Sequence, residues 1–172
     1  AISVRMTSQI QGFQMAAQHA NDAMAMLQTA DGSLTEMTNL IHRMRELAVQ
    51  ATSDTYSSSD RTALHTEYAQ LEDEIIRLTT DTKWNTMKLL DGSLNNGTFL
   101  IQVGADSGMT ISVALGTTGT GSGAALNDLA NLNVSTQATA AYTVSKIDDA
   151  LSDMGVKRAS VGAQMNRLQG AL

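Results

Sequence analysis

Apolar side chains recur at alternating steps of three and four residues through the first fifty positions, and no proline interrupts them. This spacing puts them on one face of an α-helix, so the pattern predicts a single long helix over about residues 2–53. The face consists of Met6, Ile10, Phe13, Ala17, Ala20, Met24, Leu27, Leu34, Met37, Ile41, Met44 and Ala48. At ~1.5 Å per residue this helix is roughly 75 Å long, so we expect elongated packing.

A second, shorter pattern of the same period predicts a helix over about residues 59–80. Its apolar positions are Leu64, Tyr68, Leu71, Ile75 and Leu78. The preceding run Ser57-Ser58-Ser59-Asp60 supplies the hydroxyl and carboxylate groups that cap helix N-termini. Because only a handful of residues separate the two helices, we expect them to pack antiparallel.

A third helix is predicted over about residues 137–170, with the seven-residue repeat of a coiled coil. The repeat consists of Val144, Ile147, Leu151, Met154, Val161, Met165 and Leu168. Arg158 interrupts it at a core-type position, where its charge requires a partner or an exit along its stem to water. We expect structural pairing with a carboxylate or carbonyl rather than a binding role.

The chain between these helices has a different pattern. Residues 79–96 lose periodicity around Trp84 and the pair Leu89-Leu90, which predicts an irregular strap. Residues 98–115 alternate with period two on either side of Gly104 to Gly108, which predicts a β-hairpin with a five-residue loop. Residues 116–123 have the Gly-rich composition of a flexible linker, and residues 124–133 are too short and polar for another domain, so we expect a short flexible segment over 116–133. The predicted fold is therefore mainly α: an elongated antiparallel bundle of three long helices plus a small hairpin, in one domain over residues 1–172.

Composition removes several classes of function. The formal net charge is −6 and no basic cluster exists, which argues against nucleic-acid binding. No apolar run is long enough for a membrane span, and the chain has no cysteine. His19, His42 and His65 lack the spacing of metal ligands, so we interpret them as solvated helix-surface residues, and we interpret the acidic run 72–74 as a solvated helix face. We therefore expect no enzyme activity, metal or cofactor. The chain starts at Ala1 within its periodic pattern, so we expect it to be part of a longer protein.

Several long sequence runs carry a further signal. These are Ala20-Asn21-Asp22-Ala23, Asp31-Gly32-Ser33-Leu34, Ile41 to Ala51 (IHRMRELAVQA), Asn85 to Gly92 (NTMKLLDG), Ile101 to Ala105 (IQVGA) and Gly162 to Arg167 (GAQMNR). In this order they closely resemble the conserved regions of bacterial flagellin, with Gly162, Asn166 and Arg167 in the C-terminal motif. The resemblance covers nearly the whole chain apart from about residues 116–133. Trp84 and Thr86 depart from the usual Phe and Gly of the family.

The resemblance implies a structural subunit of the extracellular flagellar filament, secreted through the flagellar export apparatus and serving motility. It implies the core domain just outside the innermost tube (D1), with outer variable domains inserted in larger relatives at residues 116–133. Other flagellin subunits, an export chaperone and a cap protein are the implied partners, and this segment alone should be a monomer. The alternatives are the junction protein between hook and filament, and a cytosolic helical adaptor or chaperone.

The resemblance also implies recognition by the innate immune receptor Toll-like receptor 5. The matching residues are Ile41, Arg43 and Glu67, with Arg45, Glu46 and Leu47 as neighbours. Arg43 has a planar head with five donors and adjacent apolar residues, which is typical of an interface hot spot. The same patch also suits packing between filament subunits, and the two roles are compatible.

Overall fold

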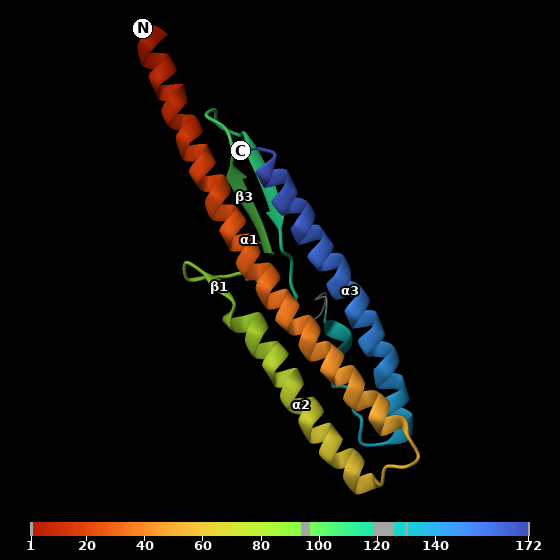
Figure 1. Ribbon diagram of the computed structural model, residues 1–172. Helices are drawn as coiled ribbons and strands as arrows, with labels where there is room; N and C mark the ends of the chain where they lie inside the picture. Colours follow the sequence, from red (N-terminus) through yellow and green to blue (C-terminus); the bar gives the residue numbers. More distant parts are fainter. Residues whose placement is uncertain (1, 94–96, 119–125, 130, 172) are drawn as a thin grey trace.

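The computed structural model describes residues 2–93, 97–118, 126–129 and 131–171. In this part of the chain the long helices are α1 (Ile2–Thr52), α2 (Ser58–Asp81) and α3 (Gln137–Gln169). Their ends agree with the predicted ranges to within one residue, so the predicted fold class is confirmed. Figure 1 shows α1 running the length of the molecule, with α2 and α3 on either side and antiparallel to it.

The core follows the inward faces of the three helices. On α1 the buried residues are Ala16, Ala20, Ala23, Met26, Leu27, Ala30, Leu34, Met37, Ile41, Met44, Leu47, Ala48 and Ala51. Tyr68 and Ile75 from α2 and Ile147, Met154 and Val161 from α3 join the same cluster. Narrow stripes of small and medium side chains therefore hold long helices together along their length.

The first turns of α1 contradict the predicted stripe. Met6, Ile10 and Phe13 are 56–58% exposed, and Ala16 is buried in place of Ala17. Figure 1 shows the physical reason for Met6, because the first turns of α1 extend beyond both α3 and the β-hairpin. Phe13 lies level with the hairpin loop, since a Cβ added at the adjacent Gly12 would meet Ala105 at 2.8 Å, but Phe13 is on a different side of the helix. The periodic pattern identifies an apolar face, and within the described residues nothing packs against that face in the first turns of α1.

At the opposite end of α1, side chains from both neighbouring helices donate hydrogen bonds to backbone carbonyls. The guanidinium of Arg61 donates to the carbonyl oxygens of Ala51 (2.7 Å) and Ser53 (2.8 Å). The side-chain amide of Gln137 donates to the carbonyl oxygen of Thr52 at 3.0 Å. These donors satisfy carbonyls that a helix end leaves unpaired. As predicted, Ser57 caps α2, in a capping box with Asp60.

The predicted irregular strap contains a small hairpin that the sequence pattern missed. Strands β1 (Lys83–Trp84) and β2 (Met87–Lys88) pair antiparallel around Asn85 and Thr86, whose φ angles are +45° and +69°. Positive φ at both central residues is the signature of a tight two-residue turn, in which glycine usually stands second. Leu89 and Leu90 are fully buried and anchor the strap, as expected.

The larger hairpin is the predicted one. Strands β3 (Thr98–Gln102) and β4 (Thr110–Ala114) pair antiparallel, with Leu100 opposite Ser112. The amide of Val103 also donates to the carbonyl of Met109 at 2.8 Å, which leaves the five-residue loop 104–108. At its other end the hairpin is closed by Gly97, whose carbonyl oxygen accepts from the amides of residues 115 and 116 at 2.7 and 3.2 Å.

Part of the predicted flexible segment is packed. Thr118, Leu126 and Leu129 are buried, the last two beside or within the short helix η2 (Asn127–Leu129). These three positions are therefore covered by the rest of the protein, and Leu126 and Leu129 belong to its core. Residues 119–125 and 130 lie outside the described residues.

Candidate functional site

Three of the predicted interface residues, Arg43, Glu46 and Glu67, lie on the surface where α1 and α2 run side by side. Arg43 donates from Nε and Nη2 to Glu67 Oε1 at 3.0 and 2.6 Å, and from Nη1 to Glu46 Oε2 at 3.0 Å. These hydrogen bonds, to Glu67 first and then to Glu46, raise the pKa of the guanidinium. All three side chains are 44–64% exposed, so the cluster is a fixed arrangement of charge that a partner could contact.

Arg45 reaches the other neighbouring helix. Its Nε donates to Asp148 Oδ1 on α3 at 2.7 Å, and both side chains are about half exposed. Residues two positions apart point to opposite sides of a helix. Arg43 therefore connects α1 to α2, Arg45 connects α1 to α3, and they do not form one patch.

The structure contradicts the predicted surface position of Ile41 and Leu47. Both are completely buried in the core, because they belong to the face of α1 that packs against the rest of the bundle. They cannot touch a partner in this conformation. The candidate interaction surface is therefore the charged cluster of Arg43, Glu46 and Glu67.

In the C-terminal motif, Gly162, Asn166 and Arg167 have little contact with the rest of the chain. Asn166 and Arg167 are exposed, and a Cβ added at Gly162 would meet nothing within 4 Å. The contact comes from Gln164, whose side-chain amide donates to the Ala114 carbonyl (2.9 Å) while its oxygen accepts from the Ala114 amide (3.0 Å). A polar residue at a seam position between Val161 and Leu168 was the signal that could have identified it.

The structure confirms the prediction for Arg158 and contradicts the prediction for His65. Arg158 donates to Asp31 Oδ1 on α1 at 3.1 Å, which confirms structural pairing. His65 is not a solvated surface residue: its Nδ1 is buried without a hydrogen-bond partner, and its ring stacks on Tyr68 with centroids 6.4 Å apart. His19 and His42 are exposed, as expected.

The acidic run 72–74 divides between two environments. Glu74 accepts hydrogen bonds from Arg77, and these lower its pKa. Burial raises the pKa of Glu72, opposed by a hydrogen bond from the Asn131 backbone. Among the described residues no three His, Cys, Asp or Glu side chains gather as a metal site would require. Nor does any helix there combine the length and apolar character needed to cross a bilayer.

Acid should weaken the fold. Hydrogen bonds from Ser57, Arg77 and Arg45 hold the pKa values of Asp60, Glu74 and Asp148 below their usual range. A carboxyl with a lowered folded pKa stabilises the fold at neutral pH, and that stability disappears as pH falls through the folded pKa. The pKa of Asp91 is lowered as well, so the raised pKa of Glu72 acts in the opposite direction as one group against four.

We expect the free energy of unfolding in urea to stay nearly level from pH 7 to about 5 and to fall below about pH 4. Asp148→Asn should reduce the slope of the unfolding free energy against pH below about pH 4, by an amount that corresponds to less than one bound proton. Helicity should be unchanged. Equal stability at pH 3 and pH 7 would contradict the assignment of these carboxyls.

Comparison with known sequences and structures identifies the family. The profile described as the bacterial flagellin N-terminal helical region matches residues 1–95, more than half of the chain. The crystal structure of Bacillus cereus flagellin superposes with a TM-score of 0.76 at 30% identity, covering 89% of this chain and 85% of that one.

The chain belongs to the bacterial flagellin family.

A flagellin of Halalkalibacterium halodurans is 37% identical over 169 residues, which are 98% of this chain and 61% of that relative. The chain thus spans less than two thirds of that flagellin's length. A putative flagellar hook-associated protein from Vibrio parahaemolyticus has a TM-score of 0.74, covering 97% of this chain and 85% of its own, but only 16% identity. That likeness shows a shared fold alone.

Proposed function

We propose that the chain is the core of a structural, non-enzymatic subunit of the flagellar filament, one elongated domain that works outside the cell. The observation that carries this proposal is the uncovered apolar face at the start of α1. Ile2, Met6, Ile10 and Phe13 share one side of the helix there and are 56–76% exposed, while Val4 and Met15 are exposed on the opposite side. Isolated soluble proteins rarely leave such a continuous apolar surface exposed, so its presence supports burial against further protein in an assembly.

The family supports other flagellin subunits as the main partners, with an export chaperone and a cap protein acting before and during assembly. Residues 116–133 remain our proposed position for outer domains in larger relatives. The putative flagellar hook-associated protein shares the fold, yet the 37% identity to a flagellin favours a filament subunit over the alternative of a hook–filament junction protein.

Assembly of the full-length protein tests the proposal. The complete chain should form filaments in the electron microscope, and Phe13→Glu should reduce them strongly by placing a charge on the uncovered face. Gln14→Glu adds the same charge at the next, polar position and serves as the matched control. A full-length protein that stays dispersed would instead favour the cytosolic adaptor, and normal filaments with Phe13→Glu would remove this face from assembly.

Recognition by Toll-like receptor 5 is a second candidate, favoured by the exposed cluster of Arg43, Glu46 and Glu67. The guanidinium donates to two carboxylates, and these hydrogen bonds restrict its position before a partner arrives, which limits the entropy lost on binding. The same cluster could also lie between filament subunits.

Arg43→Ala should weaken receptor binding and signalling by roughly tenfold or more, as expected for an arginine hot spot. Arg77→Ala is the matched control, because Arg77 is also an exposed arginine that pairs with two carboxylates, Glu74 and Asp81. Circular dichroism should show unchanged helicity for both variants. Signalling that is equal in the two variants would exclude Arg43 as an anchor.

A further inference from the structure

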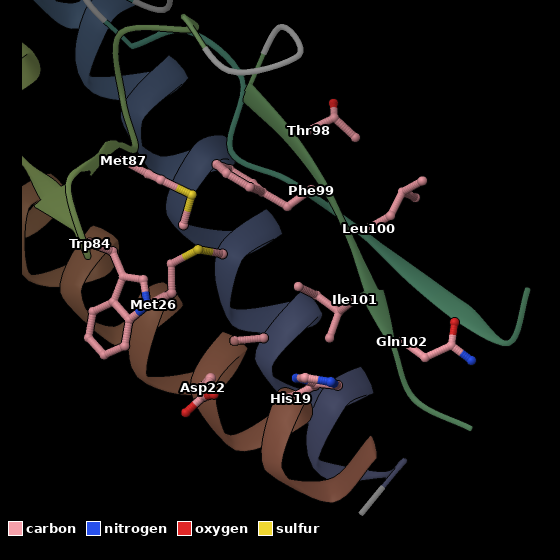
Figure 2. A pocket seen from close by; sticks show the side chains of 11 residues that line it. His19, Asp22, Met26, Trp84, Met87, Thr98, Phe99, Leu100, Ile101 and Gln102 are labelled. Atoms are coloured by element: carbon pink, nitrogen blue, oxygen red, sulfur yellow. The ribbon is translucent and has the colours of Figure 1, made fainter. Parts of the chain in front are cut away.

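A groove separates β3 from α1 and from the β1–β2 hairpin. Its volume is about 550 Å³, within the size range of ordinary ligand sites. Figure 2 shows Phe99 and Ile101 of β3 on the same side of the groove, facing Met26 of α1, with Trp84 and Met87 at its far wall. The groove thus offers an apolar floor made by three separate elements.

The strand along this groove turns part of its backbone away from β4. Residues 97 and 103 bond to β4 or its extension, which places the ladder bonds on the odd-numbered residues of β3. The pairing of Ala114 with Gln164 confirms this alternation, since even-numbered residues of β4 point away from β3. The backbone N–H and C=O of Leu100 and Gln102 therefore point away from β4, on the side of β3 toward α1 and the groove.

This edge lacks the features that usually protect an exposed strand. Its sequence, Thr-Phe-Leu-Ile-Gln at 98–102, contains no charge and no proline. Leu100 is 67% exposed on the outer face of the sheet. An uncharged edge beside an apolar groove is the arrangement that proteins use to accept an added strand.

The charge of the groove indicates what kind of strand would fit. Asp22 lines one end, next to His19 one turn earlier on α1, and no Lys or Arg lines the groove. No ion pair to Asp22 occurs among the described residues. In a chain with a formal net charge of −6, an acidic partner would be repelled here and a basic one attracted.

We propose that the groove binds an extended peptide segment of another protein as a third strand beside β3. The segment carries a large apolar side chain that packs among Met26, Trp84 and Phe99, and a basic residue that lies near Asp22. A strand added to β3 would lie ~4.8 Å from it in the plane of the sheet. The proposal does not depend on the filament role.

Trp84 makes the binding measurable, because it is the single tryptophan of the chain. The probe is an acetylated and amidated peptide with the sequence lysine, threonine, valine, leucine, valine, threonine. Its titration should shift the Trp84 fluorescence saturably. The peptide with glutamate for lysine should bind about fivefold more weakly, and Asp22→Asn should remove that difference.

Leu100→Pro tests the strand edge directly. It deletes an N–H that points away from β4, so the β3–β4 ladder survives, and it should weaken peptide binding at least tenfold. Ser112→Pro makes the same change at the opposite residue of β4, away from the groove, and should bind normally. Thermal melts of both variants establish that they are folded.

Three results would overturn the proposal. One is a fluorescence titration with no saturable change up to millimolar peptide. Another is wild-type affinity in folded Leu100→Pro. The third is concentration-dependent self-association of the unmodified chain that Leu100→Pro abolishes, which would show that a second copy occupies the groove.

Discussion

Replacing Gly97 by alanine should destabilise the protein by about 3 kcal/mol, lowering Tm by roughly 6–12 °C. Gly97 has a φ of +74°, a conformation that costs alanine ~1 kcal/mol or more. A Cβ built there would also lie 2.6 Å from the backbone nitrogen and oxygen of Gly116. The two chain segments would have to separate, weakening the hydrogen bonds that Gly97 accepts from residues 115 and 116.

Substitutions at two other glycines distinguish the cost of a positive φ from the cost of a steric clash. Gly108 has a φ of +88° but nothing within 4 Å of an added Cβ, so Gly108→Ala should lose only ~1 kcal/mol. Gly32 lies inside α1, also with nothing within 4 Å, and Gly32→Ala should stabilise the protein by about 0.5–1 kcal/mol. Urea unfolding of the three variants checks this order. Equal effects of Gly97→Ala and Gly108→Ala would contradict the close crossing at Gly116.

Leu47→Ala should cost about 2–5 kcal/mol of unfolding free energy, because it removes a fully buried side chain from the seam of α1. A residue exposed in a partner-binding patch would lose far less in the isolated chain. The experiment therefore distinguishes burial from the surface position that the sequence motif suggested.

Val49→Ala is the matched comparison. Val49 lies two positions further along α1 and is 44% exposed, so its truncation should change stability by no more than about 0.5 kcal/mol. Thermal unfolding by circular dichroism gives both values. A Leu47→Ala variant as stable as Val49→Ala would mean that Leu47 does not face the core.

The helices were predictable because their evidence is repeated along the chain. Each apolar position of α2, from Leu64 to Leu78, agrees with the same period, so errors at single residues do not move the element. The period does not say where a partner stops. The exposed position Met6 has the same spacing as buried Leu34, and Met6 is exposed because the neighbouring elements end before they reach it (Figure 1).

The candidate site was predicted less well for a geometric reason. A contiguous sequence motif winds around the whole helix, so residues 41 to 47 cover both the core and the surface of α1. Arg43 was placed correctly on the surface, whereas Ile41 and Leu47 were not. The β1–β2 turn was missed because Thr86 adopts a φ of +69°, which a β-branched residue seldom adopts.

The ion pairs between α1 and α3 also bear on how the protein is made. Arg45 and Asp148 are 103 residues apart in the chain, and Asp31 and Arg158 are 127 apart. During synthesis, α1 therefore leaves the ribosome long before its main packing partner exists. Folding that depends on such distant contacts is slow, and α1 is prone to aggregate until α3 has been synthesised and can pack against it.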